Sequence, residues 1–132
     1  MFSKDGSNLT LLQELRLKLP QIDFYTGLTN CAGDEDFYLE IMQDFVDLPI
    51  KTQLEEYYKN GDYKNYCIKI HGFKNNAYTV GAMALRELAF EMENMSRNEL
   101  TEEILEKQRE FFKQYDSLCL VYREIISRRK GE

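Results

Sequence analysis

The fold class is decided by residues 104–126, ILEKQREFFKQYDSLCLVYREII. Apolar residues recur in this stretch at intervals of three and four, which is the spacing of one face of an α-helix. We therefore expect a long helix with a wide buried face. That face comprises Ile104, Phe111, Tyr115, Leu118, Tyr122 and Ile125, flanked by Leu105, Phe112, Cys119 and Ile126.

The same helical spacing recurs upstream, and strand-like alternation is scarce. Pro20 is expected to end the first helix, and Asp34 and Asp62 are expected to cap the second and the third. Pro49 falls inside the second helix, where we expect it to kink the helix rather than end it. The four upstream helices are predicted at about residues 8–18, 34–59, 62–78 and 82–95.

Short turns separate these predicted helices. Ser96 and Glu99 match the S-x-x-E capping box, which predicts the start of the last helix. Long helices joined by short turns predict an all-α fold, an antiparallel up-and-down four-helix bundle over residues 34–127. Residues 1–20 supply an additional N-terminal covering helix. Because the sequence has no internal repeat and no long linker, we expect residues 1–132 to form a single domain.

Charge narrows the class of partner. The chain has 23 acidic and 17 basic residues, a net charge of -6, and nucleic-acid binding requires clustered Lys and Arg instead. Residues 128–130 are basic, which we interpret as a helix-end feature. No stretch approaches the roughly 20 apolar residues that cross a bilayer. We expect protein partners or small molecules, no nucleic acid, no membrane contact by this segment, and a monomer.

Cysteine and histidine usage argues against most metal and nucleotide chemistry. Cys31, Cys67 and Cys119 are far apart and lack CxxC spacing, so neither a zinc site nor a disulfide framework is predicted. A cytoplasmic location is the simplest interpretation. The single histidine, His71, cannot supply a site of two or three imidazoles, and no glycine-rich phosphate loop is present. We expect no cofactor and no bound metal.

His71 lies on the third predicted helix, whose apolar face is centred on Ile70. On a helical wheel His71 falls about 100° from that centre, so we expect it on the flank of the helix with its outer ring nitrogen in solvent. A neutral imidazole can attack phosphorus without a separate base, and Lys74, one turn on, can stabilise phosphoryl oxygens. From spacing alone, a partly packed histidine without function is the simpler interpretation.

The residues around His71 form a candidate docking surface for a partner protein. Ile68 points about 160° from the apolar centre, and an outward isoleucine beside the histidine is what such a surface needs. Single exposed apolar residues are common, so Ile68 alone is weak support. The candidate docking residues are Lys64, Ile68, Gly72, Asn75 and Tyr78.

Residues 70–95, IHGFKNNAYTVGAMALRELAFEMENM, resemble the signature of histidine-containing phosphotransfer (HPt) domains. In that signature a small or apolar residue precedes H-x-L-K-G, and an apolar-Gly-Ala turn and a Leu follow. Residues 22–46 also resemble the family's lead-in, so the resemblance covers residues 22 to about 96, with the last helix matching by pattern only. The matching residues are Ile70, His71, Phe73, Lys74, Ala77, Val80, Gly81, Ala82 and Leu85.

The resemblance implies a phosphorelay intermediate. An exposed His71 would accept a phosphoryl group at Nε2 from the aspartyl phosphate of a response-regulator receiver domain and pass it to another receiver. The family member is a phosphocarrier and not an enzyme, because the receiver supplies the acidic pocket and the Mg²⁺. The implied partners are receiver domains and a hybrid sensor histidine kinase.

Two residues depart from the family pattern. Family members usually have Gly at the position of Asn75, where the partner approaches, and Ser, Thr or Ala is commoner at the position of Gly72. An alternative function is therefore a helical interaction module that binds receivers or other signalling proteins without being phosphorylated. A third interpretation, a carboxylate-based hydrolase, has less support because the acidic residues fall mostly on predicted solvent faces.

Overall fold

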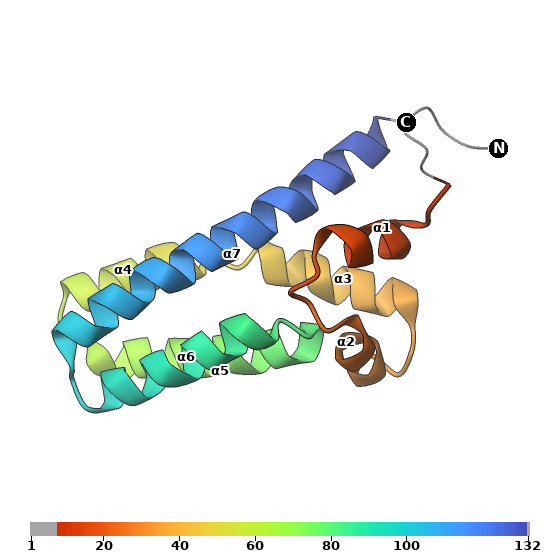
Figure 1. Ribbon diagram of the computed structural model, residues 1–132. Coiled ribbons are helices and arrows are strands. Elements are labelled where there is room, and N and C mark those ends of the chain that lie inside the picture. The colour runs from red at the N-terminus through yellow and green to blue at the C-terminus, as the bar shows by residue number, and fades with distance from the viewer. Residues whose placement is uncertain (1–7, 132) are drawn as a thin grey trace.

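The computed structural model describes residues 8–131, and this part of the chain is all-helical, without strands. Figure 1 shows α5 and α6 side by side, with the long α7 passing over them at an angle. No helix within residues 8–131 is both long enough and apolar enough to span a bilayer. The helices are α1 (Leu11–Lys18), α2 (Phe24–Asn30), α3 (Glu35–Val46), α4 (Ile50–Lys59), α5 (Tyr63–Val80), α6 (Met83–Arg97) and α7 (Thr101–Lys130).

Helix α1 is held at its start by a capping box and along its length by α7. The Thr10 hydroxyl accepts a hydrogen bond from the backbone N–H of Gln13, and the Gln13 side chain accepts one from the Thr10 N–H. Buried Glu14 pairs with Arg128 and Arg129 at the end of α7. The basic end of the sequence therefore fixes α1. Residues 1–7 of the predicted covering segment lie outside the described residues.

Pro49 does not kink a continuous helix, and that prediction was wrong. Helix α3 ends at Val46 and α4 begins at Ile50, with Pro49 at the N-cap. Proline lacks an N–H and disfavours helical backbone at the residue before it, so the helix stops ahead of Leu48 and restarts after the proline. The predicted N-caps at Asp34 and Asp62 are confirmed, because each carboxylate accepts a hydrogen bond from the N–H three residues on.

Gly81 connects α5 to α6 and also positions the segment before α2. Its φ of 87° is left-handed, and α5 ends only at Val80, two residues later than predicted. A Cβ at Gly81 would collide with the backbone carbonyl of Asp23. The Asp23 N–H donates to the Gly81 carbonyl across this contact at 2.8 Å. Only glycine fits both the turn and the close approach of the backbone segments at Gly81 and Asp23.

The predicted capping box at Ser96 and Glu99 is wrong. Helix α6 continues to Arg97, and the buried Ser96 hydroxyl donates to the Glu93 carbonyl at 2.8 Å. Serine hydroxyls inside helices commonly bond a carbonyl three or four residues back, so a serine with a glutamate three residues on does not by itself mark a helix start. Helix α7 begins without a side-chain cap, after Leu100.

The core joins α3, α5 and α7 through aromatic rings. Phe73 of α5 lies between Phe45 of α3 and Phe111 of α7, with ring centroids 5.1 and 4.9 Å away. Tyr115 packs edge-on against both Phe45 and Phe73, an arrangement that stabilises beyond the area buried. The predicted apolar face of residues 104–126 is buried as expected. Because Phe73 anchors one side of α5, His71 two residues earlier is held on a rigid helix.

Candidate functional site

Helix α5 differs in charge from the rest of the chain. Its 18 residues include three lysines, Lys64, Lys69 and Lys74, but no Asp or Glu, although the whole chain carries a net charge of -6. The only histidine, His71, lies among these lysines. The exposed Lys64 favours an acidic partner on this helix.

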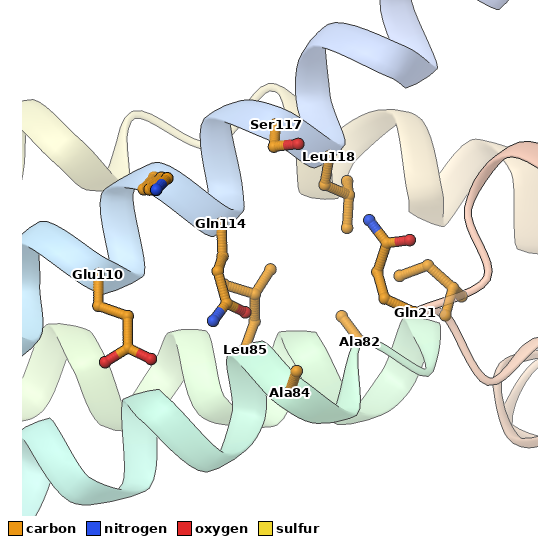
Figure 2. Close-up of a pocket in the computed structure, with 10 residues that line it drawn as sticks. Gln21, Ala82, Ala84, Leu85, Glu110, Gln114, Ser117 and Leu118 are labelled. Carbon is orange, nitrogen blue, oxygen red and sulfur yellow. The ribbon is translucent and has the colours of Figure 1, made fainter.

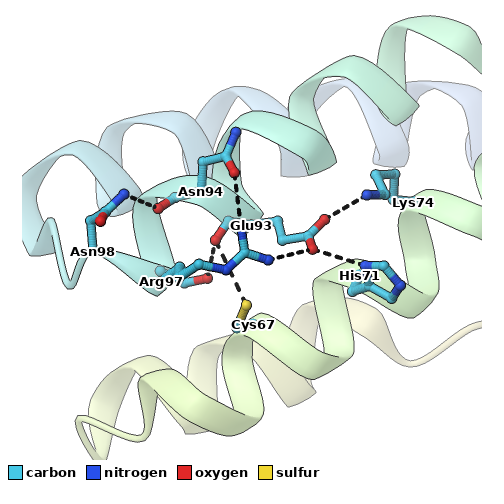
Figure 3. Close-up of polar contacts among 8 residues, drawn as sticks. Cys67, His71, Lys74, Glu93, Asn94, Arg97 and Asn98 are labelled. Carbon is cyan, nitrogen blue, oxygen red and sulfur yellow. Dashed lines mark hydrogen bonds and ion pairs between the residues drawn. The ribbon is translucent and has the colours of Figure 1, made fainter.

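The imidazole of His71 is held at one nitrogen and open at the other. Its Nδ1 lies 2.8 Å from Oε2 of Glu93 on α6 (Figure 3), and the side chain is 54% exposed. A carboxylate only accepts hydrogen bonds, so Nδ1 carries a proton, and in the neutral ring Nε2 keeps its lone pair. Nε2 has no hydrogen-bond partner among the described residues. The ring therefore presents an oriented nucleophilic nitrogen to solvent.

Glu93 is a buried carboxylate shared by three basic side chains. It is 5% exposed, and its Oε1 accepts from Lys74 Nζ at 2.7 Å while Oε2 accepts from Arg97 at 2.9 Å as well as from His71. Burial by itself raises the pKa of Glu93, but the hydrogen bonds from Lys74 and His71 outweigh it, and the pKa is lowered. Glu93 is therefore ionised at neutral pH.

Two further contacts fix the backbone of α6 at Glu93. Cys67, one turn before His71, donates its thiol to the Glu93 carbonyl at 3.7 Å, and Ser96 donates to the same carbonyl. Arg97 also donates to the Asn94 side chain at 3.2 Å. Figure 3 shows Cys67, Glu93 and Arg97 meeting between α5 and α6. The carboxylate that orients His71 is thus itself oriented by its neighbours.

Lys74 is close to His71, as predicted, but it is not a free cation. Its side chain is 18% exposed, and its Nζ forms an ion pair with Glu93. The same Nζ lies 5.3 Å from the centroid of the Phe90 ring. The ammonium group is thus neutralised by Glu93 and covered by an aromatic face. To contact a group on Nε2 of His71, the Lys74 ammonium would have to weaken or break its hydrogen bond to Glu93.

The five predicted docking residues all lie exposed on α5 with His71. Ile68 is 60% exposed and Tyr78 is 42% exposed, with the Arg86 guanidinium 4.9 Å from the centroid of the Tyr78 ring. Lys64 and Ile68 line a groove toward the end of α6, and Ile68 and Gly72 line a second groove toward α4. Asn75 is exposed one turn after His71.

Sequence reasoning missed Glu93, the residue on which the site depends. A signal was present, because Glu93 falls within the apolar stripe of α6 that includes Leu85, Ala89 and Met92. A carboxylate on a buried stripe is rarely found without a partner. The sequence alone does not say which of the basic residues on other helices it pairs with.

A separate hollow of about 450 Å³ lies between the start of α6 and the middle of α7 (Figure 2). Leu85 and Leu118 supply apolar lining, and Gln21 and Gln114 are polar. None of its lining residues belongs to the His71 site. This hollow adds nothing to the chemistry of that site.

Comparison of the chain with protein-family models, with curated protein sequences and with solved structures gave no match. Within residues 8–131, no group of three or more His, Cys, Asp or Glu side chains is arranged to hold a metal ion. The geometry of His71 and Glu93 is therefore the feature that points to a function.

Proposed function

We propose that this chain is an HPt-type phosphocarrier, which accepts a phosphoryl group on His71 from a receiver aspartyl phosphate and passes it to another receiver. The observation that carries this proposal is the exposed His71 ring, whose Nδ1 is hydrogen-bonded to the buried Glu93 while Nε2 is open. A histidine kept only for packing would not need a buried carboxylate and an open second nitrogen. The sequence resemblance around residues 70–95 supports the same function.

The transfer step follows from this geometry. The Nε2 lone pair attacks the phosphorus of the aspartyl phosphate, an N–P bond forms, the P–O bond to the aspartate breaks, and the aspartate leaves as a carboxylate. The ring gains positive charge as its lone pair is used, and the Nδ1 proton faces the Glu93 carboxylate at 2.8 Å. Glu93 thus stabilises the charge that develops in the transition state, much as a buried carboxylate supports a catalytic imidazole elsewhere.

Lys74 completes the proposed site from this side. Its Nζ shares Glu93 with His71, so a rotation of the Lys74 side chain away from Glu93 would bring it toward phosphoryl oxygens on Nε2, while Arg97 would keep Glu93 paired. The receiver would supply the acidic pocket and the Mg²⁺ that the transfer requires. No catalytic metal is assigned to this chain.

The proposal also assumes a particular arrangement and cellular setting. The broken pair α3 and α4 would act as one of four antiparallel elements with α5, α6 and α7, and α1 would be the covering helix. Two-component relays operate in the cytoplasm, which is where we expect the chain to act. A hybrid sensor kinase is the expected source of the phosphoryl group.

The direct test is transfer from a receiver domain charged with acetyl phosphate. Incubation should move phosphate onto the native chain and leave His71→Gln unlabelled, with acid-labile, alkali-stable phosphate as the signature of phosphohistidine. Because His71 is more than half exposed, the variant should fold normally by circular dichroism. Equal labelling of native protein and variant would refute the assignment.

The second candidate function is receiver binding without transfer, and Asn75 is the observation that favours it. The amide is exposed one turn from His71, where it can keep a partner's phosphorylated loop away from Nε2. In that case a receiver would bind the native chain without labelling it, and Asn75→Gly would restore labelling. Rapid labelling of the native chain excludes this function.

A further inference from the structure

Gly72, directly after His71, is a glycine that the fold itself does not require. It lies exposed within α5, its φ is not left-handed, and a Cβ built there would meet no atom within 4 Å. Gly81 and Gly27 differ, because a Cβ at either position would collide with backbone or ring atoms. Glycine inside a helix is disfavoured relative to alanine. Gly72 thus lowers the stability of the helix, and no contact within the described part of the protein requires a glycine there.

The missing side chain leaves open a groove at Gly72, the residue next to His71 in the chain, although His71 itself does not line it. This groove, about 230 Å³ in volume, lies between α5 and the junction of α3 with α4. Leu48, Pro49 and Ile50 form one wall, and Ile68 and Phe73 of α5 line the other side. The break at Pro49, which ends α3 early, therefore supplies one wall of the groove. Its walls carry five apolar side chains, and Gln53, Lys69 and Asn76 add polar groups, so the groove suits an apolar side chain that has polar neighbours.

Charge indicates the kind of surface that fits this groove. Lys69 is the only charged residue in its lining, and because Lys74 is neutralised by Glu93, Lys64 and Lys69 are the charges of α5 that no ion pair neutralises within the described residues. An acidic partner surface is therefore favoured over a basic one at this part of α5. An acidic protein surface with one projecting apolar side chain meets both requirements.

We infer that the Gly72 groove receives an apolar side chain from the acidic face of the receiver domain that exchanges phosphate with His71. This inference rests on the proposed function and adds the residue that sets how closely the partner approaches. The contact at Gly72 lies on the α4 side of His71, whereas Lys74 and Glu93 occupy its α6 side. One side of the imidazole is therefore available for docking while the other is held for the transfer chemistry.

The test is Gly72→Ala, which should have opposite effects on folding and on transfer. The melting temperature should rise by about 3–5 °C, because alanine is the better helix former and its Cβ meets no atom. The kcat/KM for labelling by a phosphorylated receiver should fall at least fivefold, mainly through KM. Phosphoramidate is a small donor that needs no groove, so it should label the variant at close to the native rate.

Ser127→Ala is the matched control, since Ser127 is an exposed helical residue of α7 outside the site. It should keep the native rate of transfer. If Gly72→Ala raises the melting temperature and is labelled by the receiver at the native rate, the groove inference is overturned while the proposed function stands. A fall in melting temperature would show that the fold requires Gly72 and would also overturn it. If receivers label neither the native chain nor the variant, the proposed function itself fails.

Discussion

Two buried glutamates, Glu14 and Glu93, meet the same physical requirement in different ways. They are 7% and 5% exposed, and each is paired with basic groups. At Glu14 both partners are arginines at the end of α7, and Arg129 also donates to the carbonyls of Leu9 and Thr10. At Glu93 one partner is His71, which keeps Nε2 in solvent. A buried charge suggests function when one of its partners retains an unused polar atom at the surface.

The largest expected effect comes from Glu93→Gln. The amide can still bond to Nδ1, but it lacks the charge that stabilises the cationic ring, so transfer to His71 should slow roughly 100-fold, or about 2.7 kcal/mol. ¹⁵N NMR of the native protein should show His71 with the proton on Nδ1, and the variant should show a mixture of tautomers. Glu87→Gln, at an exposed position on the same helix, should behave like the native chain. Native transfer kinetics in Glu93→Gln would contradict the role given to Glu93.

Glu14→Gln should affect stability alone. It removes the ion pairs with Arg128 and Arg129, and the cost should be about 2 kcal/mol in the free energy of unfolding, limited because the arginines are partly exposed and can be solvated. Urea denaturation measures this loss, with Glu124→Gln at an exposed site of α7 expected within about 0.5 kcal/mol of native. Labelling of His71 should stay within twofold of native. A clear loss of labelling would mean that the two glutamates are coupled.

Acid should progressively remove the contribution that the two ionised glutamates make to the free energy of unfolding. At each site burial raises the pKa, but hydrogen bonds from the basic partners outweigh it, so both values lie below the ordinary 4.5. A lowered folded pKa stabilises above pH 4.5, and the contribution is lost as pH falls through the folded value. The difference in urea midpoint between native protein and a Glu14→Gln, Glu93→Gln double variant should therefore shrink below pH 4.5. A constant difference from pH 7 to pH 3 would disprove this linkage.

Local rules predicted the parts of the fold that depend on neighbouring residues. The helical period of residues 104–126 and the N-caps at Asp34 and Asp62 follow from short-range chemistry, and the structure confirms them. Pro49 and Ser96 misled because the same local sequence is compatible with two outcomes. Packing decided between them: Val46 and Ile50 are both buried on either side of a break, and Ser96 is buried within α6.

The candidate site was predictable only on one helix. The flank position of His71 and the proximity of Lys74 follow from residue spacing within α5, and both agree with the structure. Glu93 lies 22 residues from His71, on α6, and its partners depend on how the two helices rotate about their axes. Spacing along one helix says nothing about that rotation. Long-range polar pairs are therefore the part of a site that a single sequence leaves open.

The bonds from Arg129 to the carbonyls of Leu9 and Thr10 join the segment directly before α1 to the end of α7. The first and last parts of the described chain are therefore in direct contact, although they are far apart in the sequence. Among the described residues, neither α1 nor the last turn of α7 contributes an atom to the His71 site. A change at this α1–α7 contact should thus alter how tightly the first helix is held and leave the geometry around His71 unchanged.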